Sequence, residues 1–202
     1  MTRVAAIERK TGETEISLLL NLDPEPSEIA AGATISTGIG FFDHMLELLA
    51  RHGRLGLEVR AVGDLETGSH HTVEDVGIAF GQALDEALGD RARIRRYADK
   101  SIPMDEALAD CAIDISGRGF CRFEANLPPV SIAGYEVELT EEFFRALATN
   151  AKLTLHINAR YGTNAHHIIE GCFKAFARTL REAVSLDPSE AGVPSTKGTL
   201  SS

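Results

Sequence analysis

Hydrophobic residues recur along this chain with two periods, one typical of helices and one typical of strands. Apolar side chains return every three or four residues in four segments, which predicts amphipathic helices over 41–53, 71–88, 142–151 and 166–183. Alternation of apolar and polar residues between turn residues predicts strands over 15–22, 33–36, 55–61, 107–115, 119–125 and 153–159. Pro24 and Pro26 mark one loop and Pro128-Pro129 another, and the Ser-, Pro- and Gly-rich segment 186–202 is predicted to be irregular.

The order helix, strand, long helix occurs twice. Phe41 corresponds to Phe143, Leu55 to Leu153, and His70 to His166, with offsets of 102, 98 and 96 residues. Offsets that change this little indicate an internal duplication in which only the connecting loops differ. The pattern predicts an α+β fold built from two copies of one unit, in which sheets pack against helices. The predicted units are residues 1–92 and 93–185, followed by the irregular tail 186–202.

Both predicted long helices begin with the pattern His-His-x-x-Glu, at two equivalent points: His70, His71, Glu74 and His166, His167, Glu170. Residues i and i+4 of a helix lie one above the other, so His70 and Glu74 can bind one ion. His71 is rotated by about 100° and can serve a second ion. One copy alone is more typical of a solvated helix start, but two equivalent copies favour a metal site.

Two further histidines lie on polar faces of their predicted elements. His156 alternates with the apolar residues of its strand, and His44 lies on the polar stripe of its helix. As plain surface residues they would have no role, but as ligands they complete a set of six histidines and two glutamates. That set suits two ions, each bound by three His and one Glu. His52 ends a helix, where cations are favoured, and is interpreted as structural.

The ligand types limit the metal. Imidazole and carboxylate without thiolate suit manganese, iron, nickel or zinc, and the carboxylates favour manganese. Asp43 and Asp75 lie beside the clusters, where they could orient imidazoles or only cap helices. A bound anion would need cationic and hydroxyl groups, and the chain offers a candidate set: Arg96, Arg118, Lys174, Ser195 and Lys197. Taken singly, each of these is an ordinary surface residue.

Composition excludes several classes of protein. The 202 residues carry a formal net charge of −10, which argues against nucleic acid or an anionic membrane surface as the main partner. We find no apolar run of about 18 residues and no signal-like start, so a cytoplasmic protein without a membrane span is expected. The odd number of cysteines predicts buried free thiols at Cys111, Cys121 and Cys172.

Seven segments resemble one enzyme family over residues 9–200: GIGFFDHML, HHTVEDVGIAFGQAL, IRRY, SGRG, LTLHI, NAHHIIEGCFKAFAR and PSTKGTL. The chain is similar in these segments to the imidazoleglycerol-phosphate dehydratases of histidine biosynthesis. The resemblance implies a duplicated unit like the second domain of ribosomal protein S5, and a homo-oligomer of 24 subunits that share active sites. It also implies dehydration of imidazole glycerol phosphate to imidazole acetol phosphate.

The resemblance further implies roles for particular residues. Two manganese ions would be held by the residues His44, His70, His71, Glu74, His156, His166, His167 and Glu170. Glu13 would move protons, and the phosphate would be held by Arg96, Arg118, Lys174, Ser195 and Lys197. The chain departs from the family pattern at Ser69, where an acidic residue is expected, and in a longer loop over 24–33.

Two other functions fit the same ligands. A dinuclear metallohydrolase of a phosphorylated compound would use a metal-bound water as its nucleophile. A metal-binding or scaffold protein would hold the ions without turnover.

Overall fold

The computed structural model describes residues 3–200, and its two halves contain the same succession of elements. The first half consists of β1 (Val4–Lys10), β2 (Thr14–Asn21), α1 (Pro26–Ala31), β3 (Thr34–Ser36), α2 (Gly40–Gly53), β4 (Gly56–Gly63) and α3 (His70–Leu88). The second half consists of β5 (Tyr97–Met104), β6 (Ala107–Asp114), β7 (Phe120–Glu124), β8 (Ser131–Ile132), β9 (Tyr135–Glu136), α4 (Leu139–Asn150), β10 (Thr154–Tyr161) and α5 (Ala165–Ala183).

The two main sheets have identical topology. Their strand orders are β1-β2-β4-β3 and β5-β6-β10-β7. In each sheet the first and second strands of this order pair antiparallel, as do the second and third. The fourth strand pairs parallel to the third. This equivalence confirms the predicted duplicated α+β unit. The predicted division into residues 1–92 and 93–185 stays a prediction, because one hydrophobic core contains buried side chains from both halves.

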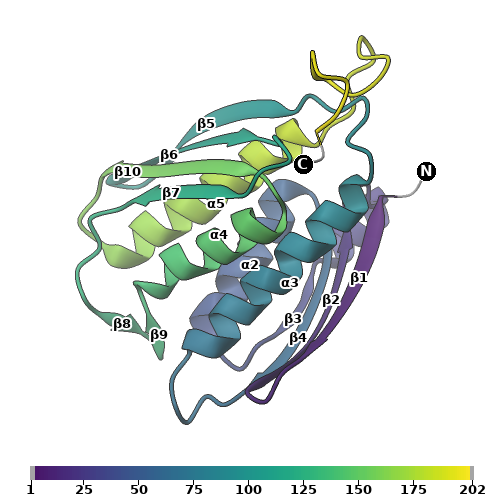
Figure 1. The fold of residues 1–202 in the computed structure, drawn as a ribbon. Helices are drawn as coiled ribbons and strands as arrows, with labels where there is room; N and C mark the ends of the chain where they lie inside the picture. Colours follow the sequence, from purple (N-terminus) through teal and green to yellow (C-terminus); the bar gives the residue numbers. More distant parts are fainter. Residues whose placement is uncertain (1–2, 201–202) are drawn as a thin grey trace.

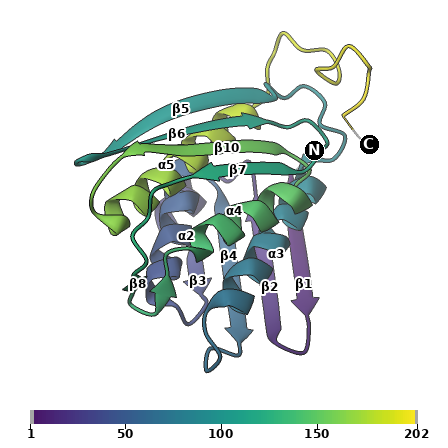
Figure 2. The same cartoon turned by 60° about the vertical axis from the view of Figure 1, so that its left-hand side comes forward.

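The sheets form the two outer layers of the molecule and the four long helices lie between them (Figures 1 and 2). Helices α2 and α3 pack on the first sheet, and α4 and α5 pack on the second. The layers join where α2 contacts α5 and α3 contacts α4. The inward side chains of the strands alternate with exposed ones, as in Thr14–Asn21, so each sheet has one face against the helices and one outward face.

Helices α3 and α4 approach closely because α3 presents glycine at the contact. A Cβ atom on Gly81 would lie 2.5 Å from the carbonyl oxygen of Leu147 and 2.7 Å from the Cβ of Asn150. One turn earlier, a Cβ on Gly77 would lie 2.8 Å from the carbonyl oxygen of Phe143. Backbone atoms cannot move aside as a flexible side chain can, so the distance between the two helices depends on these glycines.

The Gly81→Val variant is therefore expected to be destabilised by about 1–3 kcal/mol or more, because overpacking forces the helices apart. Thermal unfolding would measure the effect. Gly192→Ala is a suitable control, since a Cβ at Gly192 has no heavy atom within 4 Å. An unfolding temperature of Gly81→Val equal to that of the control would contradict the close packing.

Five elements differ from the sequence prediction, and two of them are the two-residue strands β8 and β9, which it does not contain. Residues 26–31 form the short helix α1 instead of a loop, because Pro26 occupies a first-turn position and Glu25 and Glu28 form a capping box. The edge strands β1 and β5 were missed. Edge strands bury little: β5 has no buried residue, so its sequence lacks the apolar alternation that identifies a strand. Residues 186–200, as predicted, contain no helix and no extended strand.

Candidate metal centre

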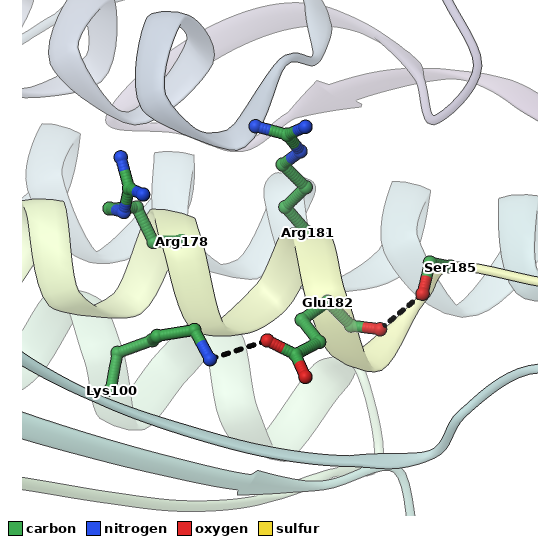
Figure 3. Close-up of a pocket in the computed structure, with 5 residues that line it drawn as sticks. All are labelled: Lys100, Arg178, Arg181, Glu182 and Ser185. Atoms are coloured by element: carbon green, nitrogen blue, oxygen red, sulfur yellow. Dashed lines mark hydrogen bonds and ion pairs between the residues drawn. The ribbon is translucent and has the colours of Figure 1, made fainter.

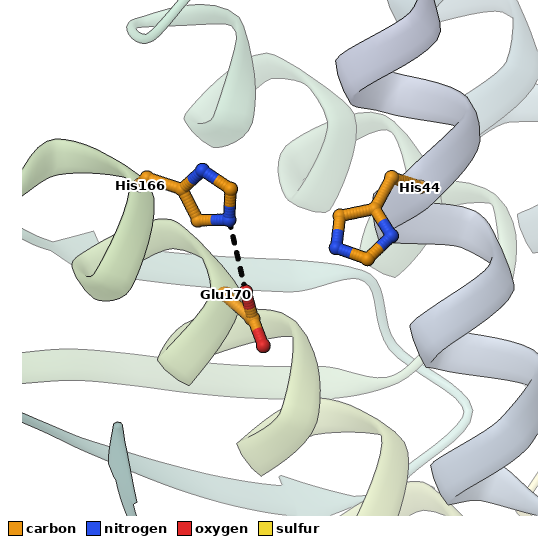
Figure 4. Close-up of side chains that lie close together, drawn as sticks. All are labelled: His44, His166 and Glu170. Carbon is orange, nitrogen blue, oxygen red and sulfur yellow. Dashed lines mark hydrogen bonds and ion pairs between the residues drawn. The ribbon is translucent and has the colours of Figure 1, made fainter. Parts of the chain in front are cut away.

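The first residues of α5 and the middle of α2 bring three predicted ligands together. Nitrogen or oxygen atoms of His44, His166 and Glu170 all lie within 4.8 Å of one another. Figure 4 shows the His44 ring, from α2, facing His166 and Glu170 across the gap between the helices. Asn164 caps α5, and its side chain accepts a hydrogen bond from the backbone N–H of His166 at 2.9 Å. The cap starts the helix at the point that places His166 and Glu170 on one face.

Glu170 is held as a carboxylate in a largely buried position. Its side chain is 9% exposed, and it lies 3.0 Å from His166 Nε2 and 2.5 Å from Lys174 Nζ. Burial alone would raise the pKa of Glu170, but the hydrogen bond and charge of Lys174, with the His166 ring, bring it below its ordinary value. An ionised carboxylate beside two imidazoles is a donor set that fits a divalent cation of the manganese to zinc series.

The imidazole of His71 lies between two carboxylates. Its Nδ1 is 3.0 Å from Asp64 Oδ2, and its Nε2 is 3.8 Å from Glu13 Oε1. The hydrogen bond to Asp64 raises the pKa of His71 and occupies Nδ1, which leaves Nε2 as the nitrogen available to a metal. On the same turn, His70 Nε2 is 3.5 Å from Glu74 Oε2, as the i,i+4 spacing predicts.

His167 has the same arrangement in the second half. Its Nδ1 is 2.6 Å from Glu106 Oε2, and its Nε2 is 3.8 Å from Asp105 Oδ2. Glu106 also accepts backbone hydrogen bonds from Thr163 and Asn164 at 3.1 and 2.8 Å. These bonds, first that of His167, lower the pKa of Glu106 to about 2, and the His167–Glu106 bond raises the pKa of His167.

Sequence reasoning missed these orienting carboxylates. Glu106 and Asp105 occupy the turn between β5 and β6, the position that corresponds to the β1–β2 turn with Glu13. An alignment of the two hairpins would have revealed them, but the edge strands that define the hairpins carry little apolar signal. Asp64, in the loop before α3, had no distinguishing pattern.

Asp75 and Asp43, which the sequence predicts either to orient imidazoles or to cap helices, both bind residues other than the histidines. Asp75 is nearly buried and accepts hydrogen bonds from Arg9 Nη2 at 2.7 Å and Thr14 Oγ1 at 2.5 Å. It therefore ties the strands on either side of the β1–β2 turn to α3 and orients no imidazole. Asp43 accepts hydrogen bonds from the backbone N–H and the hydroxyl of Thr37, which ties the segment before α2 to the helix, but no side chain caps the first turn of α2.

Within one chain the six predicted histidine ligands do not all converge. His156 lies on the outward face of the second sheet, with its ring centroid 5.6 Å from that of Phe120. The inward neighbours Leu155 and Ile157 face the helices, so the sheet separates His156 from His166. His52 is half-buried at the end of α2; burial, then the charges of Lys174 and Arg178, lower its pKa.

The proposed anion ligands fall into two places. Arg96 bonds to Asp114 at 2.8 Å and to the carbonyl oxygen of Pro194 at 2.8 Å, which places it against the tail that carries Ser195 and Lys197. Arg118 follows Gly117, whose φ is +79° and where a Cβ would overlap the carbonyl oxygen of Leu200. The turn and the tail are therefore in contact, whereas Lys174 lies apart on α5.

The remaining expectations concern thiols and membranes. Cys111 and Cys172 are buried free thiols, as predicted, but Cys121 is only half-buried. Burial raises the pKa of Cys121 and of Cys172 to about 12, which makes these thiols poor nucleophiles. Among residues 3–200, no helix combines the length and the hydropathy that a membrane span requires.

Comparisons with known proteins agree on one enzyme family. The sequence profile of the imidazoleglycerol-phosphate dehydratase family matches residues 37–180. The dehydratases of Alkaliphilus metalliredigens and Rhodopseudomonas palustris are 55% and 54% identical to this chain, over 99% and 98% of its length and 100% and 98% of theirs. The crystal structure of the Staphylococcus aureus dehydratase superposes with a TM-score of 0.80 at 40% identity, covering 91% of this chain and 99% of that one. The crystal structure of Pyrococcus furiosus IGPD in complex with (S)-C348 superposes with a TM-score of 0.80 at 33% identity. The match covers 96% of this chain and 99% of that one. The chain belongs to the imidazoleglycerol-phosphate dehydratase family.

Proposed function

We propose that this protein dehydrates imidazole glycerol phosphate to imidazole acetol phosphate, a step of histidine biosynthesis. The observation that carries the proposal is the grouping of His44, His166 and Glu170 within 4.8 Å, in a chain 55% identical to a dehydratase. Loss of water needs a broken C–O bond next to the imidazole and removal of a proton from the neighbouring carbon. The enol that results rearranges to the ketone.

The donor set favours two manganese ions, although other divalent ions of the same series would fit. The residues that would hold them are those predicted from spacing: His44, His70, His71, Glu74, His156, His166, His167 and Glu170. When bound, such ions stabilise the negative charge that an imidazole substrate develops as its hydroxyl leaves. The protein prepares the site by holding the Nδ1 atoms of His71 and His167 on carboxylates, which directs both Nε2 atoms to a ligand.

Association of several chains would complete the ligand set. Side chains fill the space between the starts of α5 and α3: the Phe41 ring lies 5.1 Å from His166 and 5.3 Å from Tyr135. Beyond them, Ser69 Oγ donates a hydrogen bond to the Gly134 carbonyl at 2.7 Å. We therefore infer that His70, His71 and His156 meet the α2–α5 cluster of a neighbouring copy, in a homo-oligomer of 24 subunits as in the family resemblance.

Glu13 would move the protons. It lies at the tip of the β1–β2 turn, partly exposed and 3.8 Å from His71 Nε2. Arg9 and Thr14 flank the turn and both bond to Asp75 on α3, so the tip has a defined place above the start of that helix. The phosphate would bind Arg96, Arg118, Ser195 and Lys197 of one chain and Lys174 of another.

The test measures ketone formation from imidazole glycerol phosphate. The wild-type protein is expected to produce the ketone without releasing phosphate. Glu13→Gln is expected to lower kcat by about 10²–10⁴-fold at unchanged metal content, because proton transfer contributes that much. Glu15→Gln, an exposed residue on the neighbouring strand, serves as the control.

Two results would favour the alternatives. Release of phosphate without a ketone would indicate a metallohydrolase. Metal retention without turnover, with Glu13→Gln indistinguishable from wild type in every assay, would indicate a non-catalytic metal-binding protein.

A further inference from the structure

The two halves differ in charge at one pair of equivalent positions. Asp85 near the end of α3 forms an ion pair with Lys152 of the second half, which follows α4, at 2.7 Å, and a second ion pair with Arg91. The offset between the long helices makes Arg181 the counterpart of Asp85, and the offset between the following strands makes Arg54 the counterpart of Lys152. Arg54 and Lys152 even share left-handed backbone conformations, with φ of 51° and 53°. Where one pair of equivalent positions forms an ion pair, the other therefore brings together two like charges.

Two more arginines lie beside this pair. Arg51, Arg54, Arg178 and Arg181 line one hollow of about 470 Å³ between α1, α2 and α5; we call these four residues the arginine cluster. Figure 3 shows Arg178 and Arg181 extending from the same side of α5, away from the ion pair of Lys100 and Glu182. Over the described residues, none of the four has a carboxylate oxygen within 4.0 Å. Burial and the charges of Arg54 and Arg178 lower the pKa of Arg181.

Helix dipoles account for only part of this charge. The ends of α2 and α5 both lie at the cluster, and each helix C-terminus carries the equivalent of about −0.5 charge. Together they offset about one of four positive charges. The protein as a whole has a net charge of −10, so a surplus of cations here runs against its composition. Moreover, Arg54 adopts a left-handed conformation in which glycine is ordinarily favoured.

We propose that the arginine cluster is a binding site for a multivalent phosphate anion, separate from the substrate's phosphate. Guanidinium groups match phosphate oxygens in pairs, and several of them around one hollow require a ligand with more than one negative charge. The hollow of about 470 Å³ has room for a small anion such as phosphate.

The position along α5 separates this site from the catalytic groups. Arg181 follows Glu170 by eleven residues, a rise of about 16 Å at 1.5 Å per residue. An imidazole bound at Glu170 carries its phosphate on a three-carbon chain, which is shorter than this distance. The inference stands on the charge arrangement and does not depend on the proposed dehydration.

The test compares phosphate binding by the assembled, metal-loaded wild type with that of Arg181→Asp, which would restore the ion pair that Asp85 and Lys152 form. Isothermal titration with inorganic phosphate at constant ionic strength is expected to show one binding equivalent per chain fewer in the variant. Without phosphate the variant should unfold at a higher temperature than wild type, and phosphate should raise the wild-type unfolding temperature more. The control is Arg60→Ser, an exposed arginine on the outward face of the first sheet.

Three results would overturn the proposal. Phosphate binding and unfolding temperatures equal to those of wild type would show that the cluster binds no anion. A tenfold rise in KM for imidazole glycerol phosphate would place Arg181 in the substrate's own phosphate pocket. A changed assembly size, with the same phosphate equivalents as wild type, would show that carboxylates of a second copy fill the cluster. Arg178→Ser offers an independent measurement if Arg181→Asp does not fold.

Discussion

The His166→Ala variant is expected to retain about half of the wild-type metal and to lose about a thousandfold in kcat. His166 lies in the cluster with His44 and Glu170, and its removal leaves Glu170 bound to Lys174 alone. Electrostatic stabilisation by a bound ion contributes several kcal/mol to a reaction of this kind, and about 4 kcal/mol corresponds to a thousandfold in rate. Metal analysis of the purified variant, together with the ketone assay, would measure both effects.

His52 provides the matched control, because it is the one histidine outside the predicted ligand set. His52→Gln is expected to keep its full metal content. If His166→Ala also keeps the full content, the assignment of the α2–α5 cluster as a metal centre is wrong, whatever the rate.

The Glu106→Gln variant is expected to bind metal about 10–100-fold more weakly, with a similar loss of activity. A glutamine carbonyl can still accept the hydrogen bonds from Thr163 and Asn164, but its NH2 group cannot accept the hydrogen bond that His167 Nδ1–H donates to Glu106. The ring then favours the tautomer that carries its proton on Nε2, the nitrogen required as a ligand.

Histidine titration by NMR on metal-free protein gives a second measurement. Glu106 raises the pKa of His167, so in the Glu106→Gln variant the pKa of His167 should fall toward the ordinary value for histidine. Glu86→Gln, an exposed change on α3, should leave the titration as it is in wild type. An unchanged His167 titration and wild-type metal affinity in Glu106→Gln would contradict the orienting role.

Most of the fold could be predicted because two copies of one pattern reinforce each other. The α2, β4, α3 succession and its counterpart α4, β10, α5 bury strongly periodic faces, which the sequence displays directly. The edge strands β1 and β5 could not be identified in this way, since an edge strand in contact with one neighbour needs few apolar residues. Helix α1 was missed for another reason: Pro24 before it and Pro26 at its start resemble a loop unless the capping glutamates are considered.

The site was predictable to the extent that ligands sit on helices. The i,i+4 spacing identified His70 with Glu74 and His166 with Glu170 correctly as neighbours. Spacing cannot show which face of a sheet meets which helix, so the separation of His156 from His166 emerged only in three dimensions. Nor can it show partners contributed by turns, such as Glu106, because Glu106 and the His167 ring that it contacts are 61 residues apart in the sequence.

The continuous core has a consequence for the history of this fold. The faces of α2 and α3 that point away from their own sheet are covered by α5 and α4 of the other half. A single repeat on its own would expose those apolar faces to water, and two identical copies could bury them only by pairing about a twofold axis. The fused chain has the arrangement that a symmetric dimer of one unit would have. Within one chain the two equivalent ends need not be identical, and here one carries the ion pair of Asp85 and Lys152 while the other carries the arginine cluster.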